Sequence, residues 1–295
     1  MTQPIGFIGL GNLGTAMAKR LAEQANSLVL WNRTPGKAEA LIATLPAPNS
    51  HSVATHPADV VSKCEIVILN LFDTEAVKQV VAGVNGIFES DCRGKVIVDT
   101  TTNHFSEVAT IYGLIEDAGG KYLEAPVLGS VVPAQQGNLT MLVSGDKRSY
   151  ENSKPLLDQL AKTIFYLEER TLATRIKLLN NLVLGSIMGA IAEAVSIGEV
   201  SGIDRARLLE ILAAGAGNSA VMNAKRQKLV DSDFTPHFSV GAIHKDMEYL
   251  KAMSTALKLE PAMVEAVRRI FNRAEKAGLG DLDFSAVIKS MSKGH

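Results

Sequence analysis

The chain has 295 residues, of which 46% are hydrophobic and 21% are charged, a composition that supports one large or two ordinary folded domains. The formal net charge is −1 and no basic stripe stands out, so the sequence argues against nucleic acid as a partner. The longest uncharged apolar run, residues 178–192, contains two asparagines and is shorter than the roughly 20 residues that a bilayer span needs, so no membrane partner is expected.

The cysteines and histidines predict neither disulfides nor a metal centre. Cys64 and Cys92 stand at no motif spacing and are expected to be free thiols, which suits a reducing compartment. The first residues lack the basic-then-apolar order of a secretory signal, so a cytoplasmic location is expected. The six histidines are scattered and do not pair at zinc-ligand spacing on a plausible helix, so no metal is expected.

Strand-like and helix-like segments alternate over the first half of the chain. Amphipathic stretches such as residues 12–25 and 105–118 separate several short β-rich runs. This alternation predicts a largely parallel sheet with helices on both faces, an α/β doubly wound domain of the Rossmann type. The predicted strands are residues 5–10, 27–31, 65–71, 95–101, 121–128, 139–144 and 163–167.

A glycine-rich segment, GFIGLGNLG, connects the first predicted strand to the first predicted helix. Gly9, Gly11 and Gly14 have the G-x-G-x-x-G spacing of a dinucleotide site in its required strand–turn–helix context. Gly9 permits the tight turn, Gly11 lets the backbone approach a pyrophosphate, and Gly14 lets helix and strand pack closely. We expect N–H groups at the helix N-terminus, around Asn12 and Leu13, to hold the pyrophosphate.

The end of the second predicted strand distinguishes between the two nicotinamide cofactors. NAD sites usually place an acidic residue there for the ribose 2′-hydroxyl, whereas this sequence offers Asn32, Arg33 and Thr34, with Lys37 opening the next helix. Arg33 can clamp a 2′-phosphate with paired hydrogen bonds, and Lys37 adds a point charge. The sequence therefore predicts NADP(H). The alternative is that Arg33 and Lys37 are simply solvated charges.

The strand signal stops near residue 170, and helical patterns follow. Gly202 and Asp204 fit a helix end and the next N-cap, and Pro261 fits the first turn of the last long helix. We therefore predict a Rossmann domain at 1–168 and an all-α domain at 169–295, joined by a long helix. The apolar helical domain also predicts a homo-oligomer, a dimer or a tetramer. The predicted helices are residues 172–201, 204–214, 218–231, 239–257 and 261–277.

Polar residues interrupt the most apolar of these helices. Lys177 and Asn181 lie four residues apart among leucines, so they share one helix face. Burying either group without a partner is costly, which suggests a functional cleft. The alternative is that Lys177 caps the helix or extends its ammonium group to solvent from a core helix.

Six segments in order along the chain carry a resemblance to a known family. They are GFIGLGNLG at the start, VDTTT at 98–102, EAPVLGSVVPAQQGNLTMLVSGD at 124–146, KLLNN at 177–181, AEA at 192–194 and HKDMEYL at 244–250. Together they resemble the β-hydroxyacid dehydrogenases, which include 3-hydroxyisobutyrate dehydrogenase and the glyoxylate/succinic semialdehyde reductases. The resemblance covers essentially the whole chain.

The resemblance implies a role for each matching position. It implies that Lys177 is the catalytic lysine, that Asn181 orients substrate or lysine, and that both contact the substrate. An ammonium group there would stabilise the charge that grows on a carbonyl oxygen during hydride transfer and would donate the proton. The resemblance also implies a substrate loop at Leu128, Gly129 and Ser130, and further cofactor contacts from Leu71, Phe72, Thr101, Thr102 and Lys245.

One departure from the family pattern keeps alternatives open. Leu128 replaces the serine that the family usually has in its substrate loop, and leucine cannot hydrogen-bond a carboxylate. The predicted function is an NADPH-dependent oxidoreductase acting on a small hydroxy acid or semialdehyde. An imine reductase-like enzyme, which generally lacks the lysine, and a non-catalytic nucleotide-binding scaffold are the alternatives.

Overall fold

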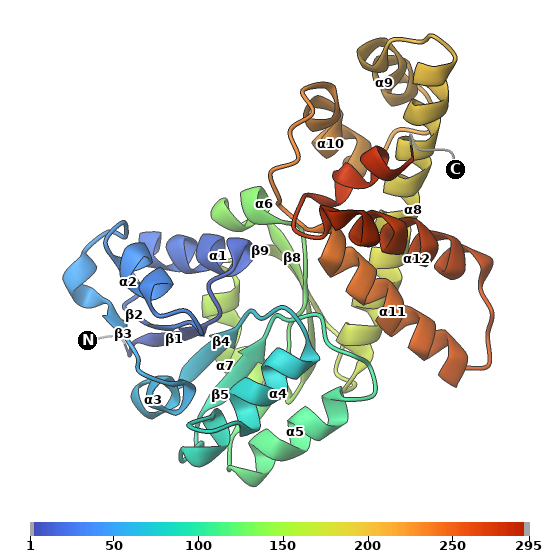
Figure 1. Cartoon of the computed structure of the whole chain (residues 1–295). Helices are drawn as coiled ribbons and strands as arrows, with labels where there is room; N and C mark the ends of the chain where they lie inside the picture. The colour runs from blue at the N-terminus through green and yellow to red at the C-terminus, as the bar shows by residue number, and fades with distance from the viewer. Residues whose placement is uncertain (1–2, 292–295) are drawn as a thin grey trace. The chain divides into compact units, whose positions relative to one another are not determined.

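The computed structural model describes residues 3–291 and divides into two compact units, Met1–Lys177 and Leu178–His295. The division falls inside one continuous helix, α8 (Leu172–Val200), whose first residues belong to the first unit and whose remainder belongs to the second. Figure 1 shows the strands gathered in the first unit, and the second unit built from helices.

The sheet of the first unit has the strand order of a Rossmann fold. Strands β1 to β6 run in the order β3-β2-β1-β4-β5-β6, and each pair along this path is parallel. Beyond β6, strand β8 is antiparallel to β6 and β7 and parallel to β9. The strands are β1 (Ile5–Ile8), β2 (Leu28–Trp31), β3 (Ser52–Val53), β4 (Ile66–Leu69), β5 (Val96–Asp99), β6 (Lys121–Glu124), β7 (Val127–Leu128), β8 (Leu139–Gly145) and β9 (Ala161–Tyr166).

Successive strand residues pack into cores on opposite faces of the sheet, as a period of two requires. Phe7 packs in one core with α1 (Asn12–Glu23), α6 (Val131–Gln135), α7 (Lys147–Leu157) and the helix that follows β2. Its neighbour Ile8 packs in the other core with a second group of helices. Figure 1 shows that second group along one side of the sheet: α3 (Pro57–Lys63), α4 (Thr74–Ala82) and α5 (Val108–Asp117). Helix α2 (Gly36–Ile42) buries Ala38 and Leu41. The predicted doubly wound fold is confirmed.

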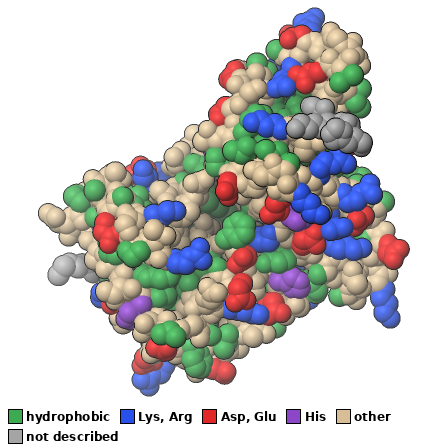
Figure 2. All heavy atoms as spheres, viewed as in Figure 1, with side chains coloured by type: hydrophobic (Ala, Val, Ile, Leu, Met, Phe, Trp, Pro, Cys, Tyr) green, Lys and Arg blue, Asp and Glu red, His purple; other side chains and the backbone are tan. Residues whose placement is uncertain are grey.

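The helices of the second unit begin at side-chain caps. Asp204, Ser219 and Ser239 each accept a hydrogen bond from an N–H of the following first turn. The helices after α8 are α9 (Arg205–Ala214), α10 (Ala220–Val230), α11 (Val240–Ala256) and α12 (Ala262–Ala274), followed by a π-helical turn (Glu275–Leu279) and a 3-10 helix (Phe284–Ser290). Charged side chains of both signs gather on the face that carries α11 and α12, where Arg268 pairs with Glu248 and Glu265 (Figure 2).

The structure corrects several predicted boundaries. The predicted strand 121–128 is two strands, because Pro126 has no N–H to donate to a ladder. The predicted helix 261–277 begins at Ala262, with Pro261 as its N-cap, and gives way to the π-helical turn after Ala274. Strand β3 and helices α3, α4, α6 and α7 were not predicted.

Helix α8 (Leu172–Val200) extends beyond the uncharged apolar run at residues 178–192 at both ends. By length and composition alone it could cross a membrane, although 44% of its most apolar window is buried inside the protein. Core helices of folded domains pass the same test. Met188 and Val195 are buried members of this helix, and Gly185 lies directly against Val267 and Phe271 of α12.

Candidate cofactor and catalytic site

The three glycines of the first loop have different physical roles. Gly9 has φ +100°, and a Cβ there would lie 2.2 Å from the Asn70 carbonyl oxygen. A Cβ at Gly14 would lie 2.1 Å from the Gly9 carbonyl oxygen, so these two glycines shape the loop and its contact with α1. A Cβ at Gly11 would meet nothing within 4 Å among the described residues. Gly11 therefore leaves open space where a phosphate can approach the backbone.

The N-terminus of α1 follows this loop directly. Its positive dipole end is not neutralised by a nearby carboxylate of the described residues. Gly11 is the N-cap, and within residues 3–291 no side chain caps the helix and no carboxylate lies in its first turn, which starts at Asn12 and Leu13. The positive end of the helix dipole is suited to an anion. The loop therefore fits the pyrophosphate of a dinucleotide.

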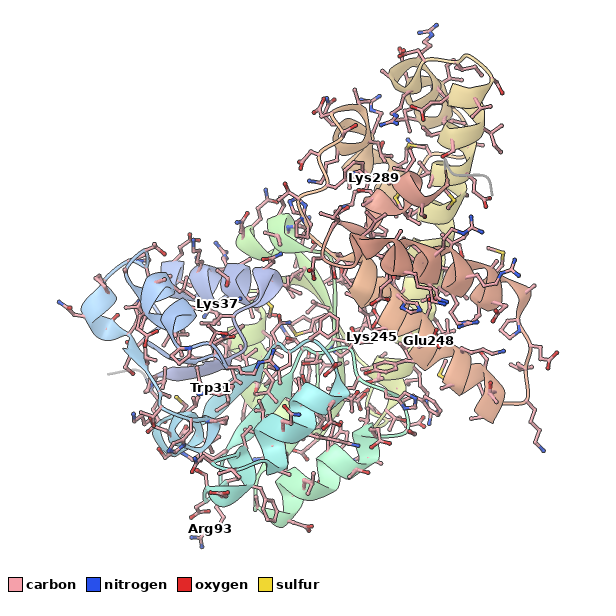
Figure 3. All side chains as sticks on the ribbon, viewed as in Figure 1. Trp31, Lys37, Arg93, Lys245, Glu248 and Lys289 are labelled. Carbon is pink, nitrogen blue, oxygen red and sulfur yellow. The ribbon has the colours of Figure 1, made fainter. Side chains whose placement is uncertain are left out.

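Asn32 connects the glycine loop to the end of β2. Its Oδ1 accepts a hydrogen bond from the Leu10 N–H at 2.9 Å, and its Nδ2 donates to the Thr34 carbonyl at 3.1 Å. Arg33, Thr34 and Lys37 are exposed beside it, and neither cation is held in an ion pair by any residue in the described part of the chain. Figure 3 shows Lys37 on α2 and Trp31 at the end of β2. These cations are available to a 2′-phosphate.

Side-chain hydrogen bonds also fix the loops that follow β4 and β5. The Thr101 hydroxyl accepts from the Leu71 N–H at 3.0 Å, and Asn70 donates to the Thr100 hydroxyl at 2.9 Å. Thr101 is buried, and the neighbouring Thr102 is half-buried. Phe72 is 58% exposed, which is unusual for a phenylalanine. These loops begin at the same carboxyl edge of the sheet as the glycine loop, which is the usual ligand-binding edge of such folds.

Asp99, the last residue of β5, holds the loop that follows this strand through buried hydrogen bonds. It accepts hydrogen bonds from the Thr101 N–H at 2.8 Å, the Asn103 side chain at 2.8 Å and the Tyr122 hydroxyl at 2.6 Å. Burial raises the pKa of Asp99, while these donors oppose that rise. Its three hydrogen bonds are those of a residue that holds a turn.

The loop at residues 128–130 requires glycine at its centre. Leu128 ends β7 and pairs with Thr140 of β8, and Gly129 follows with φ +119°. A Cβ at Gly129 would lie 2.8 Å from Leu139 Cδ2. Leu128 is half-buried, and Ser130 precedes α6. The only side-chain hydrogen-bonding group among these three residues is therefore the Ser130 hydroxyl.

Lys177 lies in the second turn of α8 and is the last residue of the first unit. Its side chain is nearly buried, with 8% of the residue exposed. The first turn of α8 is fixed to the sheet by Glu124 and Ser144, which accept hydrogen bonds from the backbone of residues 171–174. The helix that carries Lys177 therefore starts at the carboxyl end of β6.

In the second unit, Asn181 belongs to a buried polar cluster. Its Nδ2 donates to Asp246 Oδ2 at 2.6 Å, and the Lys245 ammonium lies 3.0 Å from Asp246 Oδ1. Lys245 also lies 5.0 Å from the centre of the Tyr249 ring. Figure 3 shows Lys245 and Glu248 on α11. Asp246 was missed as a site residue, although it follows Lys245 directly in the HKDMEYL segment.

Two family models together match nearly the whole chain. The NAD-binding domain of 6-phosphogluconate dehydrogenase matches residues 4–168, and the NAD-binding domain of NADP-dependent 3-hydroxyisobutyrate dehydrogenase matches residues 172–291. Glyoxylate/succinic semialdehyde reductase 1 from Arabidopsis thaliana is 34% identical, with 97% of this chain and 98% of that protein covered. The 3-hydroxyisobutyrate dehydrogenase structure from Salmonella typhimurium has a TM-score of 0.88 at 24% identity, over 98% of this chain and 99% of that one.

Two further similarities are more limited in coverage or in identity. The human cytokine-like nuclear factor N-PAC is 32% identical over 97% of this chain, but this chain covers only 51% of that protein. The imine reductase structure from Pseudomonas sp. has a TM-score of 0.66 at 20% identity, over 98% of this chain and 100% of that one, a likeness of fold alone. The matches over the whole chain show that the protein belongs to the β-hydroxyacid dehydrogenase family, as an NADP(H)-dependent oxidoreductase.

Proposed function

We propose that the chain reduces a small carbonyl acid, such as glyoxylate or a semialdehyde, to the corresponding hydroxy acid with NADPH. The observation that carries this proposal is the nearly buried Lys177, on a helix fixed to the same sheet edge that bears the glycine loop. NADPH, when bound, supplies the hydride. The Lys177 ammonium stabilises the negative charge that develops on the carbonyl oxygen and donates the proton that completes the alcohol.

The remaining site residues bind and orient. The backbone at Gly11, Asn12, Leu13 and Gly14 holds the pyrophosphate, and Arg33 with Lys37 holds the 2′-phosphate. Asn181 orients the substrate or Lys177. The other cofactor contacts that we propose come from Gly9, Asn32, Thr34, Leu71, Phe72, Thr101, Thr102 and Lys245.

The loop at 128–130 is proposed to select the substrate. Leu128 offers no hydrogen bond, so a substrate carboxylate would be held by the backbone N–H groups of Gly129 and Ser130 and by the Ser130 hydroxyl. The apolar Leu128 side chain favours a substrate with an aliphatic segment next to its carboxylate. Succinic semialdehyde meets that requirement better than glyoxylate.

A substrate panel tests the proposed function. The purified chain is mixed with NADPH and with glyoxylate, succinic semialdehyde or a cyclic imine such as 1-pyrroline, and NADPH absorbance is followed. We expect oxidation with the carbonyl acids and none above background with the imine. Turnover of the imine alone would indicate an imine reductase. NADPH binding without any turnover would indicate a nucleotide-binding scaffold.

We also propose that the chain forms a homo-oligomer. Helix α8 exposes an apolar series, Leu179, Val183, Ile197 and Val200, and monomeric proteins seldom expose large contiguous apolar patches. Light scattering during size-exclusion chromatography tests this proposal, which a monomer at assay concentrations would refute.

The free thiols of Cys64 and Cys92, both buried, support the proposal of a cytoplasmic location.

A further inference from the structure

Glu124 is a buried carboxylate at the end of β6 that the proposed chemistry does not use. Its Oε1 accepts a hydrogen bond from the Thr171 N–H at 2.6 Å. Its Oε2 accepts from the Thr174 N–H at 3.1 Å and from the Thr174 hydroxyl at 2.6 Å. Both oxygens are therefore directed at the first turn of α8, about 50 residues further along the chain.

These bonds satisfy the N–H groups that every helix leaves without partners at its start. The Ser144 hydroxyl accepts from the Ala173 N–H at 3.1 Å and satisfies one more. A carboxylate at a helix N-terminus is also favoured by the helix dipole. Glu124 thus acts as an N-cap supplied by the sheet rather than by the residue before the helix.

The backbone that Glu124 holds is conformationally unfavourable. Thr171 has φ +70° and Glu168, three residues earlier, has φ +57°, in a region that non-glycine residues rarely adopt. Such conformations persist when the surroundings determine them strongly, and they concentrate at functional sites. The Thr171 N–H bonded to Glu124 belongs to one of these residues. The loop is also fixed to α5, because Arg170 pairs with Glu116 and lies over the Tyr112 ring.

Lys177 follows Thr174 by three residues, so the two side chains lie on neighbouring positions of one helix face. A helix start that is fixed by two carboxylate oxygens and one hydroxyl leaves little freedom for the next turn. We propose that Glu124 is a positioning residue for Lys177, which it serves by fixing the first turn of α8 to the carboxyl end of β6. This inference rests on the proposed function of Lys177.

The chain offers matched variants for the test. Glu124→Gln keeps the shape but places an amide group against N–H donors that need an acceptor. Thr174→Val removes the hydroxyl bond to Glu124, and Thr174→Ser restores it. Tyr112→Phe is the control, because the Tyr112 hydroxyl donates to Glu124 Oε1 at 3.2 Å and to the Ser144 carbonyl at 3.0 Å. It removes a hydrogen bond to Glu124 but none of the bonds between Glu124 and the backbone of residues 171–174.

The kinetic readout separates positioning from a general loss of structure. Because small displacements of a reacting group are costly, we expect Glu124→Gln to lower kcat by roughly 10- to 100-fold while the Kd for NADPH stays within about twofold. Thr174→Val should lower kcat less, Thr174→Ser should recover it, and Tyr112→Phe should leave it near the wild-type value. A wild-type kcat in a folded Glu124→Gln variant, or equal losses in Glu124→Gln and Tyr112→Phe, would overturn the proposal.

A second readout does not depend on activity. Amide hydrogen exchange over residues 171–177 should accelerate in Glu124→Gln and stay unchanged in Tyr112→Phe, because only the first loses bonds to that backbone. If the wild-type chain turned over no carbonyl substrate, the proposed function would fail while faster exchange still supported the anchoring. Unchanged exchange in Glu124→Gln would overturn the anchoring whatever the activity.

Discussion

Each of the two units buries a carboxylate, and the two units offset the cost of burying that charge differently. In the first unit, Glu124 is surrounded by neutral donors from the backbone and hydroxyl groups. In the second, Asp283 is paired with the Lys225 ammonium at 2.8 Å, and their side chains are 0% and 8% exposed. Hydrogen-bond donors fix direction, whereas an opposite charge compensates for lost hydration.

The pKa values of the two carboxylates are shifted in opposite directions by these different surroundings. Burial raises the pKa of Glu124, and its donors only oppose that rise. Burial is the largest single influence on Asp283 and opposes its ionisation. The Lys225 charge, together with hydrogen bonds from Lys225, Ser285 and the His237 N–H, outweighs burial and keeps the pKa of Asp283 below its ordinary value. The first unit therefore uses a buried carboxylate to orient a functional helix, and the second uses one to hold α10 against the C-terminal segment.

Breaking the ion pair of the second unit should have the largest effect on stability. Because Lys225→Met leaves Asp283 buried without its cation, we expect the free energy of unfolding to fall by about 3–5 kcal/mol. Lys228→Met is the control on the same helix. Lys228 pairs with the half-exposed Asp233, so this substitution should cost much less stability. Urea denaturation followed by circular dichroism measures both, and equal losses would contradict the contrast.

Substitution of the exposed Arg33, which follows β2 in the first unit, should weaken cofactor binding and leave the free energy of unfolding unchanged. Hydrogen bonds to charged groups contribute about 1.5–3 kcal/mol, so Arg33→Ala should raise the Kd for NADPH by roughly 10- to 100-fold. The Kd for NADH should change little, because NADH lacks the 2′-phosphate. Calorimetric titration with both cofactors measures this, and an equal loss for both would place the phosphate clamp elsewhere.

The smallest expected effect is on the pH dependence of stability, to which Glu124 and Asp283 should contribute with opposite signs. The raised pKa of Glu124 contributes stability below its ordinary value of 4.5 that is lost as pH rises through the folded-state pKa. The lowered pKa of Asp283 contributes stability above its ordinary value of 3.8 that is lost as pH falls through the folded-state pKa.

Urea unfolding of three proteins across this acidic range tests the signs. Relative to Glu124→Gln, the wild type should lose stability as pH rises. Relative to Lys225→Met, its advantage should shrink as pH falls, because protonated Asp283 no longer needs a cation. Parallel pH curves for all three proteins would mean that neither carboxylate has the assigned environment.

The sequence predicts those features whose cause is local. The glycine loop depends on backbone sterics within a few residues, and the structure shows Gly9 and Gly14 in close contacts and Gly11 open. The N-cap at Asp204 and the helix end at Gly202 were also predicted, and both are confirmed. The largely parallel sheet with helices on both faces followed from the alternation of elements, because parallel strands require crossover helices.

Features that depend on distant partners were missed. Glu124 reaches the first turn of α8, Asn32 holds Leu10, and Asp283 pairs with Lys225. No local sequence pattern predicts any of these three contacts. Helices α3 and α4 are short, so their periodicity is weak. The roles of Lys177 and Asn181 came from a family resemblance combined with spacing on one helix face, and they remain predictions.

Single-turnover reduction by a Lys177→Ala variant tests the central claim most directly. General acid–base groups contribute about 10²- to 10⁴-fold, so the rate of NADPH oxidation on mixing with succinic semialdehyde should fall by roughly that factor, while NADPH binding is retained. Arg175→Ala, an exposed change two residues away, should leave the rate unchanged. A Lys177→Ala rate close to that of the wild type would contradict the assignment of Lys177 as the proton donor.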